Sequence, residues 1–138
     1  MEDLSLHILD IIDNAMAAGA SEIGVRILLE AEKDLLTLEI TDNGQGMDPE
    51  TAAKALDPFY SSKPGKRIGL GIPLLAQAAR EAEGRLQLFS EPYSGTRIVA
   101  SFRLSHPDRK PLGDVEETMY ILQKTHPEIR FSFEYVKK

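Results

Sequence analysis

Three groups of residues in this chain have types and spacings that suit the binding of a polar ligand. Asp10 and Asn14 lie four residues apart in an otherwise apolar stretch. Residues 42–47 read Asp-Asn-Gly-Gln-Gly-Met, and residues 69–71 read Gly-Leu-Gly. A carboxylate, a carboxamide and two glycine-bearing segments together favour a purine-nucleotide pocket with a phosphate end and a metal end.

The segment that begins at Asp42 directly follows an alternating apolar run, so it lies at the end of a strand. There a carboxylate can accept a hydrogen bond from an exocyclic amine, and Gly44 and Gly46 allow the backbone to approach a flat ligand. Asn-Gly is also a common turn dipeptide, so a plain turn is the alternative interpretation.

The second glycine segment, residues 69–71, opens a helix. Free amides and the helix dipole at such a start suit phosphate groups. The segment lacks the Gly-Lys-Ser/Thr of a phosphate-binding loop and the third glycine of a dinucleotide fingerprint. Its Gly-x-Gly spacing is therefore a weak signal when taken alone.

The first polar pair lies on a helix expected over residues 3–18, which Gly19 is placed to end. Its polar residues form one stripe, because they are spaced by four, three and four positions: Asp3, His7, Asp10 and Asn14. The apolar stripe must face the core, so the polar stripe faces a cleft or the solvent. A solvated face is the simpler interpretation of such a stripe, and asparagine, a poor residue inside a helix, shifts the balance a little toward a cleft.

The remaining elements follow from periodicity, turn residues and caps. We expect strands at 23–29, 36–40, 86–88, 98–104 and 129–136, and helices at 49–56, at about 70–83 and from 114 to Pro127. Residues 57–68 form a loop and 105–112 a linker. Hairpins outnumber obligatory crossovers, which predicts an α+β fold: a two-layer sandwich whose mixed, mostly antiparallel sheet carries helices on one face.

Composition narrows the classes of function. The 138 residues include 16 basic and 22 acidic side chains, a net charge of -6 that argues against a nucleic-acid surface. The absence of cysteine excludes disulfides and thiolate chemistry. No run approaches the roughly 18 apolar residues of a membrane span, and acidic residues follow the first methionine. We therefore expect a cytoplasmic protein with no membrane segment.

The order of these motifs resembles the ATP-binding domain of the GHKL superfamily (gyrase, heat-shock chaperone, histidine kinase, MutL), and above all histidine-kinase-like members. The resemblance covers residues 4–104 and implies the Bergerat-type fold. Residues 10–15 look like the N box, 42–47 like the G1 box, 57–63 like the F box, 69–71 like the G2 box and 94–96 like the late Gly-Thr motif.

The resemblance implies a role for each matching position, with ATP and Mg²⁺ as the ligands. Asn14 would ligate the metal, and Asp42 would accept from the adenine amino group. Thr96 would join a water network there. The other implied nucleotide contacts are Gly44 and Gly46, with Met47 packing near the base, the phosphate-contacting segment Gly69, Leu70 and Gly71, and Lys63 near the terminal phosphates.

Asp10 stands where hydrolysing members carry a glutamate as general base. Its shorter arm leaves a carboxylate about 1 Å further from its water, so slow hydrolysis is expected. The resemblance therefore implies a stand-alone signalling kinase that acts on a protein partner in trans. A slow ATPase of MutL or chaperone type, working as a conformational switch, and a non-catalytic ATP-binding regulatory module are the alternatives.

The last quarter of the chain lies beyond the resemblance. We expect residues 1–104 to form the ATP-binding domain and residues 105–138 a helix-strand extension packed on it. That extension can complete a sheet that would otherwise have an unpaired edge. Its aromatic strand, with Phe131, Phe133 and Tyr135 on one face, can pack at home or pair with a second copy, so a homodimer is possible.

Overall fold

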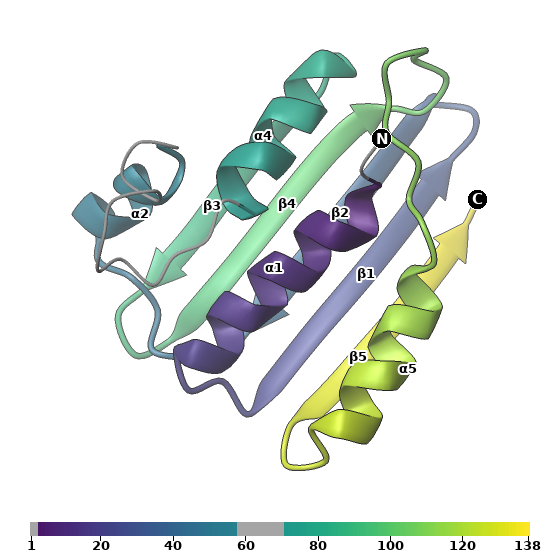
Figure 1. The fold of residues 1–138 in the computed structure, drawn as a ribbon. Coiled ribbons are helices and arrows are strands. Elements are labelled where there is room, and N and C mark those ends of the chain that lie inside the picture. Colours follow the sequence, from purple (N-terminus) through teal and green to yellow (C-terminus); the bar gives the residue numbers. More distant parts are fainter. Residues whose placement is uncertain (1–2, 58–70) are drawn as a thin grey trace.

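The computed structural model describes residues 3–57 and 71–138. This part of the chain forms helices on one face of a five-stranded sheet (Figure 1). In chain order the elements are α1 (Leu4–Ala17), β1 (Glu22–Glu30), β2 (Leu35–Asp42), α2 (Pro49–Ala55), α4 (Gly71–Glu81), β3 (Arg85–Glu91), β4 (Gly95–Arg103), α5 (Val115–Thr125) and β5 (Arg130–Lys137).

The strands lie in the order β3-β4-β2-β1-β5. The β1–β2, β2–β4 and β3–β4 pairs are antiparallel, whereas β1 and β5 are parallel. The predicted α+β sandwich with a mixed, mostly antiparallel sheet is therefore confirmed.

Alternation along the strands separates a buried face from an open one. On β1, Ile23, Val25 and Ile27 are buried under the helices, and Leu38 and Ile40 of β2 lie beside them. The open face carries charged side chains in pairs across strands, namely Arg26 with Glu134 and Arg97 with Glu39, each at 2.8 Å. The core consequently lies between the sheet and α1, α4 and α5.

Helix α1 is the central helix of that layer. Leu4, Ile8 and Ile12 are fully buried. Its first two amides donate to a crossing segment of the chain, Leu4 to the carbonyl of Pro111 and Ser5 to that of Leu112, at 2.8 and 2.9 Å. The linker expected at 105–112 thus supplies the acceptors that a helix start otherwise lacks.

Helix α4 differs from the expected fourteen-residue helix. It runs for 11 residues from Gly71 to Glu81, and Leu70 lies outside the described residues. A Schellman motif ends the helix, with the amide of Glu83 on the carbonyl of Arg80 and the amide of Gly84 on that of Ala79. Glu83, with φ of 59°, is therefore the left-handed residue, and Gly84 follows it.

Across residues 3–57 and 71–138, every helix is too short or too polar to cross a membrane.

Candidate functional site

A cavity of about 110 Å³ lies on the helix-covered face of the sheet, at the end where β2 stops. Five residues predicted for the site line it, namely Asn14, Asp42, Gly46, Met47 and Thr96. The rest of its wall is apolar and comes from α1, α4, β4 and the turn after α1: Ile11, Ala15, Ala18, Ile72 and Ile98. The cavity thus combines an apolar wall with a carboxylate, a hydroxyl and a carboxamide.

Asp42 is the last residue of β2, where Ile23 of β1 and Thr96 of β4 flank it in the sheet. Its Oδ1 accepts a hydrogen bond of 2.8 Å from the amide of Gly44. Burial raises the pKa of the Asp42 carboxyl, and the backbone amides of Gly44 and Thr96 oppose that rise. The site therefore holds a partly desolvated acceptor of fixed orientation.

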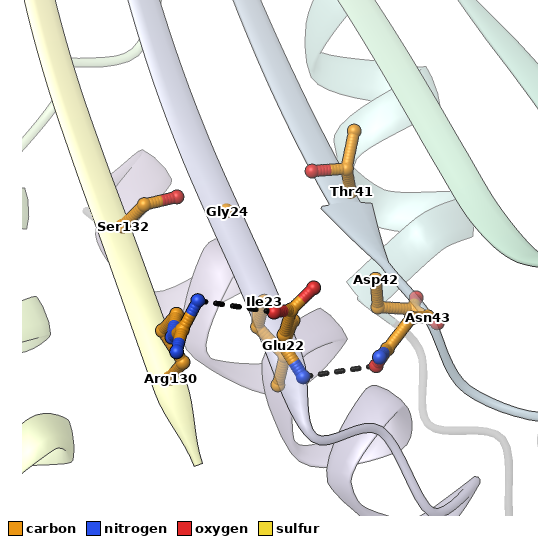
Figure 2. Close-up of a pocket in the computed structure, with 8 residues that line it drawn as sticks. All are labelled: Glu22, Ile23, Gly24, Thr41, Asp42, Asn43, Arg130 and Ser132. Carbon is orange, nitrogen blue, oxygen red and sulfur yellow. Dashed lines mark hydrogen bonds and ion pairs between the residues drawn. The ribbon is translucent and has the colours of Figure 1, made fainter.

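The loop after Asp42 is fastened to the start of β1 by Asn43. The side-chain Oδ1 of Asn43 accepts from the amides of Ser21 and Glu22 at 2.8 and 2.9 Å, and its Nδ2 donates to the Ser21 hydroxyl at 2.9 Å. Figure 2 shows the hydrogen bond between Asn43 and the amide of Glu22 at a second hollow, of about 330 Å³, which Gly24 also lines. That hollow lies on the open face of the sheet, whereas the first cavity lies under the helices.

Gly46 and Gly95 let the loop and the β3–β4 turn approach closely. Both have positive φ, at 71° and 98°. A Cβ on Gly46 would lie 2.0 Å from the carbonyl oxygen of Glu91, and one on Gly95 would lie 2.1 Å from that of Asp42. Gly46 in the loop and Gly95 at the turn thus allow the two backbones to pack closely beside the cavity, and only glycine fits at either position.

Ser90 of β3 joins two lining residues. The amide of Met47 donates to its Oγ at 2.8 Å, and its Oγ lies 2.8 Å from the hydroxyl of Thr96. Sequence reasoning missed both Ser90 and Asn43, because neither residue type in its strand or turn context signals a long-range contact. Each becomes recognisable only when the strand register is known.

The remaining predicted residues lie beside the cavity or outside the described chain. Gly44 is buried, and a Cβ on it would lie 3.2 Å from the Ala18 carbonyl oxygen. A Cβ on Gly71 would lie 3.0 Å from the Cβ of Asp10, so the start of α4 packs directly on α1 there. Three predicted residues fall outside the described residues: Lys63, Gly69 and Leu70.

The polar stripe of α1 extends past the cavity. Asn14 lines the cavity, Asp10 lies one turn away at the α4 contact, and His7 is 4% exposed. Burial and the neighbouring Asp10 raise the pKa of Asp13, while His126 opposes them. Of the two alternatives for this stripe, Asn14 therefore faces a cavity.

No cluster of three or more metal-binding side chains occurs within residues 3–57 and 71–138. Mg²⁺ commonly binds through only one or two protein oxygens together with substrate phosphates. The side-chain oxygen of Asn14, on the cavity wall, and the carboxylate of Asp10, one turn away, are of the right type. The residues present therefore fit a magnesium ion that arrives with a nucleotide.

Comparison with known proteins places this fold and cavity in a family. The sequence profile of the histidine kinase-, DNA gyrase B-, and HSP90-like ATPases matches residues 2–106. The chain belongs to that family. It is an ATP-binding, histidine-kinase-like module.

Individual relatives are sensor proteins. The chain is 36% identical over 110 residues to the sensor protein kinase FleS of Pseudomonas aeruginosa, which covers 80% of this chain and 27% of that protein. It is 30% identical over 95 residues to the heme sensor protein HssS of Staphylococcus saprophyticus, with 68% and 21% covered. The chain therefore spans about a quarter or less of the length of these relatives.

Proposed function

We propose that this chain binds Mg-ATP in the α1–β2–β4 cavity and transfers the terminal phosphoryl group to a protein partner in trans. The observation that carries the proposal is the convergence of Asn14, Asp42, Gly46, Met47 and Thr96, from three separate parts of the chain, on one cavity. Its 110 Å³ is less than the roughly 300–1,000 Å³ of whole-ligand pockets, so it suits the base end of a nucleotide.

In this proposal the carboxylate of Asp42 accepts from the adenine amino group, and the Thr96 hydroxyl, held by Ser90, completes the polar rim. Met47 and Ile98 pack against the base from the apolar wall. A carboxylate acceptor selects adenine, because a guanine presents a carbonyl oxygen at the equivalent position and leaves the buried acceptor unpaired.

The phosphate end would lie toward the α1–α4 contact, where Gly71 packs beside Asp10. Asn14, on the cavity wall, would hold the metal ion, which would neutralise charge on the phosphates. We assign the phosphate contacts to the segment 69–71 and to Lys63, as the family resemblance implies. Phosphoryl transfer then depends on positioning and electrostatics more than on covalent chemistry by the protein.

Asp10 is the candidate general base, and its chemistry separates the proposed kinase from its rivals. An aspartate reaches about 1 Å less far than the glutamate of hydrolysing members, which disfavours activation of water. Transfer to a partner is then the main fate of the phosphoryl group.

A nucleotide-driven switch with slow hydrolysis is the second candidate. It is favoured by the way the loop 43–46 is tied to three elements at once. The backbone amide of Gln45 donates to the carbonyl of Ala18 after α1 at 2.9 Å, and the backbone carbonyl of Gln45 accepts from the amide of Tyr93 in the β3–β4 turn at 2.6 Å. Asn43 ties the same loop to the start of β1. A ligand that moves this loop would change the contacts at each attachment. A ligand-dependent change of contacts is the physical requirement for a conformational switch. A non-catalytic regulatory module would bind ATP at the same place.

The deciding experiment incubates the purified chain with ATP labelled on the terminal phosphate, alone and with candidate partner proteins that carry histidine or serine acceptors. Label on a partner protein supports the kinase. We propose that this reaction takes place in the cytoplasm, where ATP is plentiful. Free phosphate that disappears in Asp10→Asn supports the switch. Tight binding with neither product supports the regulatory module, and an absence of ATP binding contradicts all three.

A further inference from the structure

Among residues 3–57 and 71–138, β5 is an edge strand of the sheet. β5 is the last strand of the order β3-β4-β2-β1-β5, and Figure 1 shows it at the border of the sheet beside α5. At the opposite border, α2 packs against β3. Within the described residues no strand pairs with the outer side of β5, so its outward amides and carbonyls form a template for another strand.

The direction of the backbone groups along β5 follows from two hydrogen bonds to the β1 side. The amides of Arg130 and Lys138 donate to the carbonyls of Ser21 and Leu29, at 2.8 and 2.7 Å. Because backbone groups alternate along a strand, the even-numbered residues of β5 face β1 and the odd-numbered residues face outward.

Gln123 of α5 occupies the first part of this edge. Its Nε2 donates to the carbonyl of Ile129 at 2.9 Å, and its Oε1 accepts from the outward amide of Phe131 at 3.2 Å. The side-chain amide thus replaces a neighbouring strand at these two residues. The open part of the edge is limited to Phe133, Tyr135 and Lys137, and Tyr135 is its centre.

Apolar surface lies exposed along the open part. Tyr135 is 49% exposed, although it lies on the helix-covered side of the strand. Beside it is a hollow of about 290 Å³ whose apolar lining comes from Ile27, Leu112, Val115 and Phe133. An unpaired edge, an exposed aromatic ring and an apolar hollow therefore coincide at one place in the fold.

We propose that the open half of β5 pairs with the same segment of a second copy of this chain, in an antiparallel register centred on Tyr135. Centring on Tyr135 uses every free outward group and avoids the part held by Gln123. It places the two Tyr135 side chains opposite each other and Glu134 opposite Val136. The neighbouring register, centred on Glu134, would place two like charges face to face, which is unfavourable.

Charge complementarity supports a second copy as the occupant. In the Tyr135-centred register, Lys137 of one chain lies opposite Phe133 of the other, on the helix-covered side. The hollow at Phe133 is bordered by Glu116 at the start of α5. Neither Lys137 nor Glu116 has an ion-pair partner within residues 3–57 and 71–138, so two symmetric pairs between chains can form.

Sedimentation velocity across the micromolar range tests the pairing on the full chain. We expect a concentration-dependent dimer that is lost in Tyr135→Pro. Proline at this position removes an outward amide, which β1 does not use, so the monomer keeps its sheet. Unchanged circular dichroism and ATP affinity would verify that the monomer is intact, since Tyr135 lies away from the candidate nucleotide cavity.

The charge pair tests the register. Lys137→Glu and Glu116→Lys should each weaken the dimer about tenfold or more, because like charges then meet across the interface. The double variant should restore it. A monomer at every concentration, a dimer insensitive to Tyr135→Pro, or the absence of rescue in the double variant would overturn the proposal. Because these readouts do not involve phosphate transfer, they stand apart from the proposed kinase activity.

Discussion

Asp42 shows how a ligand site can reduce the stability of the ligand-free protein. Its carboxylate is partly buried at the end of β2, and burial raises its pKa against the pull of the backbone amides of Gly44 and Thr96. The ionised form is therefore favoured less in the folded chain than in the unfolded one. The site retains an acceptor whose desolvation cost the two amides offset only in part.

Replacement of Asp42 by Asn should stabilise the ligand-free chain at neutral pH while it weakens nucleotide binding. A raised folded pKa means that the contribution of this group to stability is present below the unfolded pKa and is lost as the pH rises through the folded pKa. The advantage of Asp42→Asn should therefore be largest near neutral pH and shrink in acid. Denaturant unfolding of both proteins across that pH range measures it. An advantage that grows in acid would contradict this assignment.

Gly46→Ala should destabilise the chain by roughly 2–4 kcal/mol, from a steric clash combined with a left-handed backbone. The added Cβ would lie 2.0 Å from the Glu91 carbonyl oxygen. Gly19→Ala is the matched control, because Gly19 also has a positive φ, of 81°, but has no atom within 4 Å of the added Cβ. It should cost only about 1–2 kcal/mol. Equal losses in chemical denaturation would show that packing at Gly46 contributes nothing.

At the residue scale the sequence indicated which residues gather at the candidate site better than it indicated the contacts that hold them. Asn14, Asp42, Met47 and Thr96 were predicted for the site, and they do line one cavity. Residues that hold the loop in place through long-range hydrogen bonds, such as Asn43, could not be found, because their partners lie about 20 positions away in sequence. Such contacts depend on strand register, which alternating polarity does not specify on its own.

Helix ends illustrate the element scale. Both α1 and α4 end in a Schellman motif, with Gly19 as the left-handed residue of the first and Glu83, at φ of 59°, in the second. The side chain of Glu83 contacts Arg103 at 3.4 Å and His106 at 3.3 Å, and all but His106 are well exposed. Surface ion pairs of this kind contribute little to stability. They therefore do not offset the cost of the left-handed backbone at Glu83.

Glu83→Gly should accordingly stabilise the chain by about 0.5–1 kcal/mol, because glycine removes the left-handed cost of roughly 1–2 kcal/mol and surrenders only weak ion pairs. Thermal unfolding at neutral pH measures the gain. Glu83→Ala is the control, since it loses the ion pairs and keeps the strained backbone. If the alanine variant were as stable as the glycine variant, the ion pairs and not the backbone would govern this position.

Elements were predictable where periodicity was strong. The alternating runs of β1 and β2 and the apolar stripe of α1 lie within about two residues of their expected bounds. The C-terminal end of α4 lies equally close to its expected bound, but its left-handed residue was not predictable, because Gly84 suggested the stop and Glu83 adopts that conformation one position earlier. Gly84 is instead required by packing, since a Cβ there would lie 1.7 Å from the Ser101 carbonyl oxygen.

At the scale of the whole molecule, the segment after residue 104 is part of the same sheet. β5 pairs along the whole of β1, in register from Glu22 with Arg130 to Leu29 with Lys137. The crossing segment also accepts the first amides of α1 at Pro111 and Leu112. We propose that residues 105–138 form one folding unit with residues 1–104.

A chain ending at Leu104 tests that proposal. It would expose the edge of β1 and remove α5 from the core, so it should self-associate or lose cooperative unfolding. Size-exclusion chromatography with light scattering and denaturant titration provide the readouts. A monodisperse, cooperatively unfolding truncated chain would show instead that the last 34 residues are dispensable for the fold.

Equilibrium binding of ATP in the presence of Mg²⁺, by titration calorimetry, tests the central claim most directly. We expect saturable binding with one site per chain and a preference for ATP over GTP. Asp42→Asn should weaken it by roughly 10- to 100-fold, the loss of a hydrogen bond to a charged acceptor. The Arg26–Glu134 pair on the open face offers a control, because Arg26→Ala should leave the affinity unchanged. No binding to the intact chain, or equal affinity in Asp42→Asn, would contradict the assignment of this cavity to ATP.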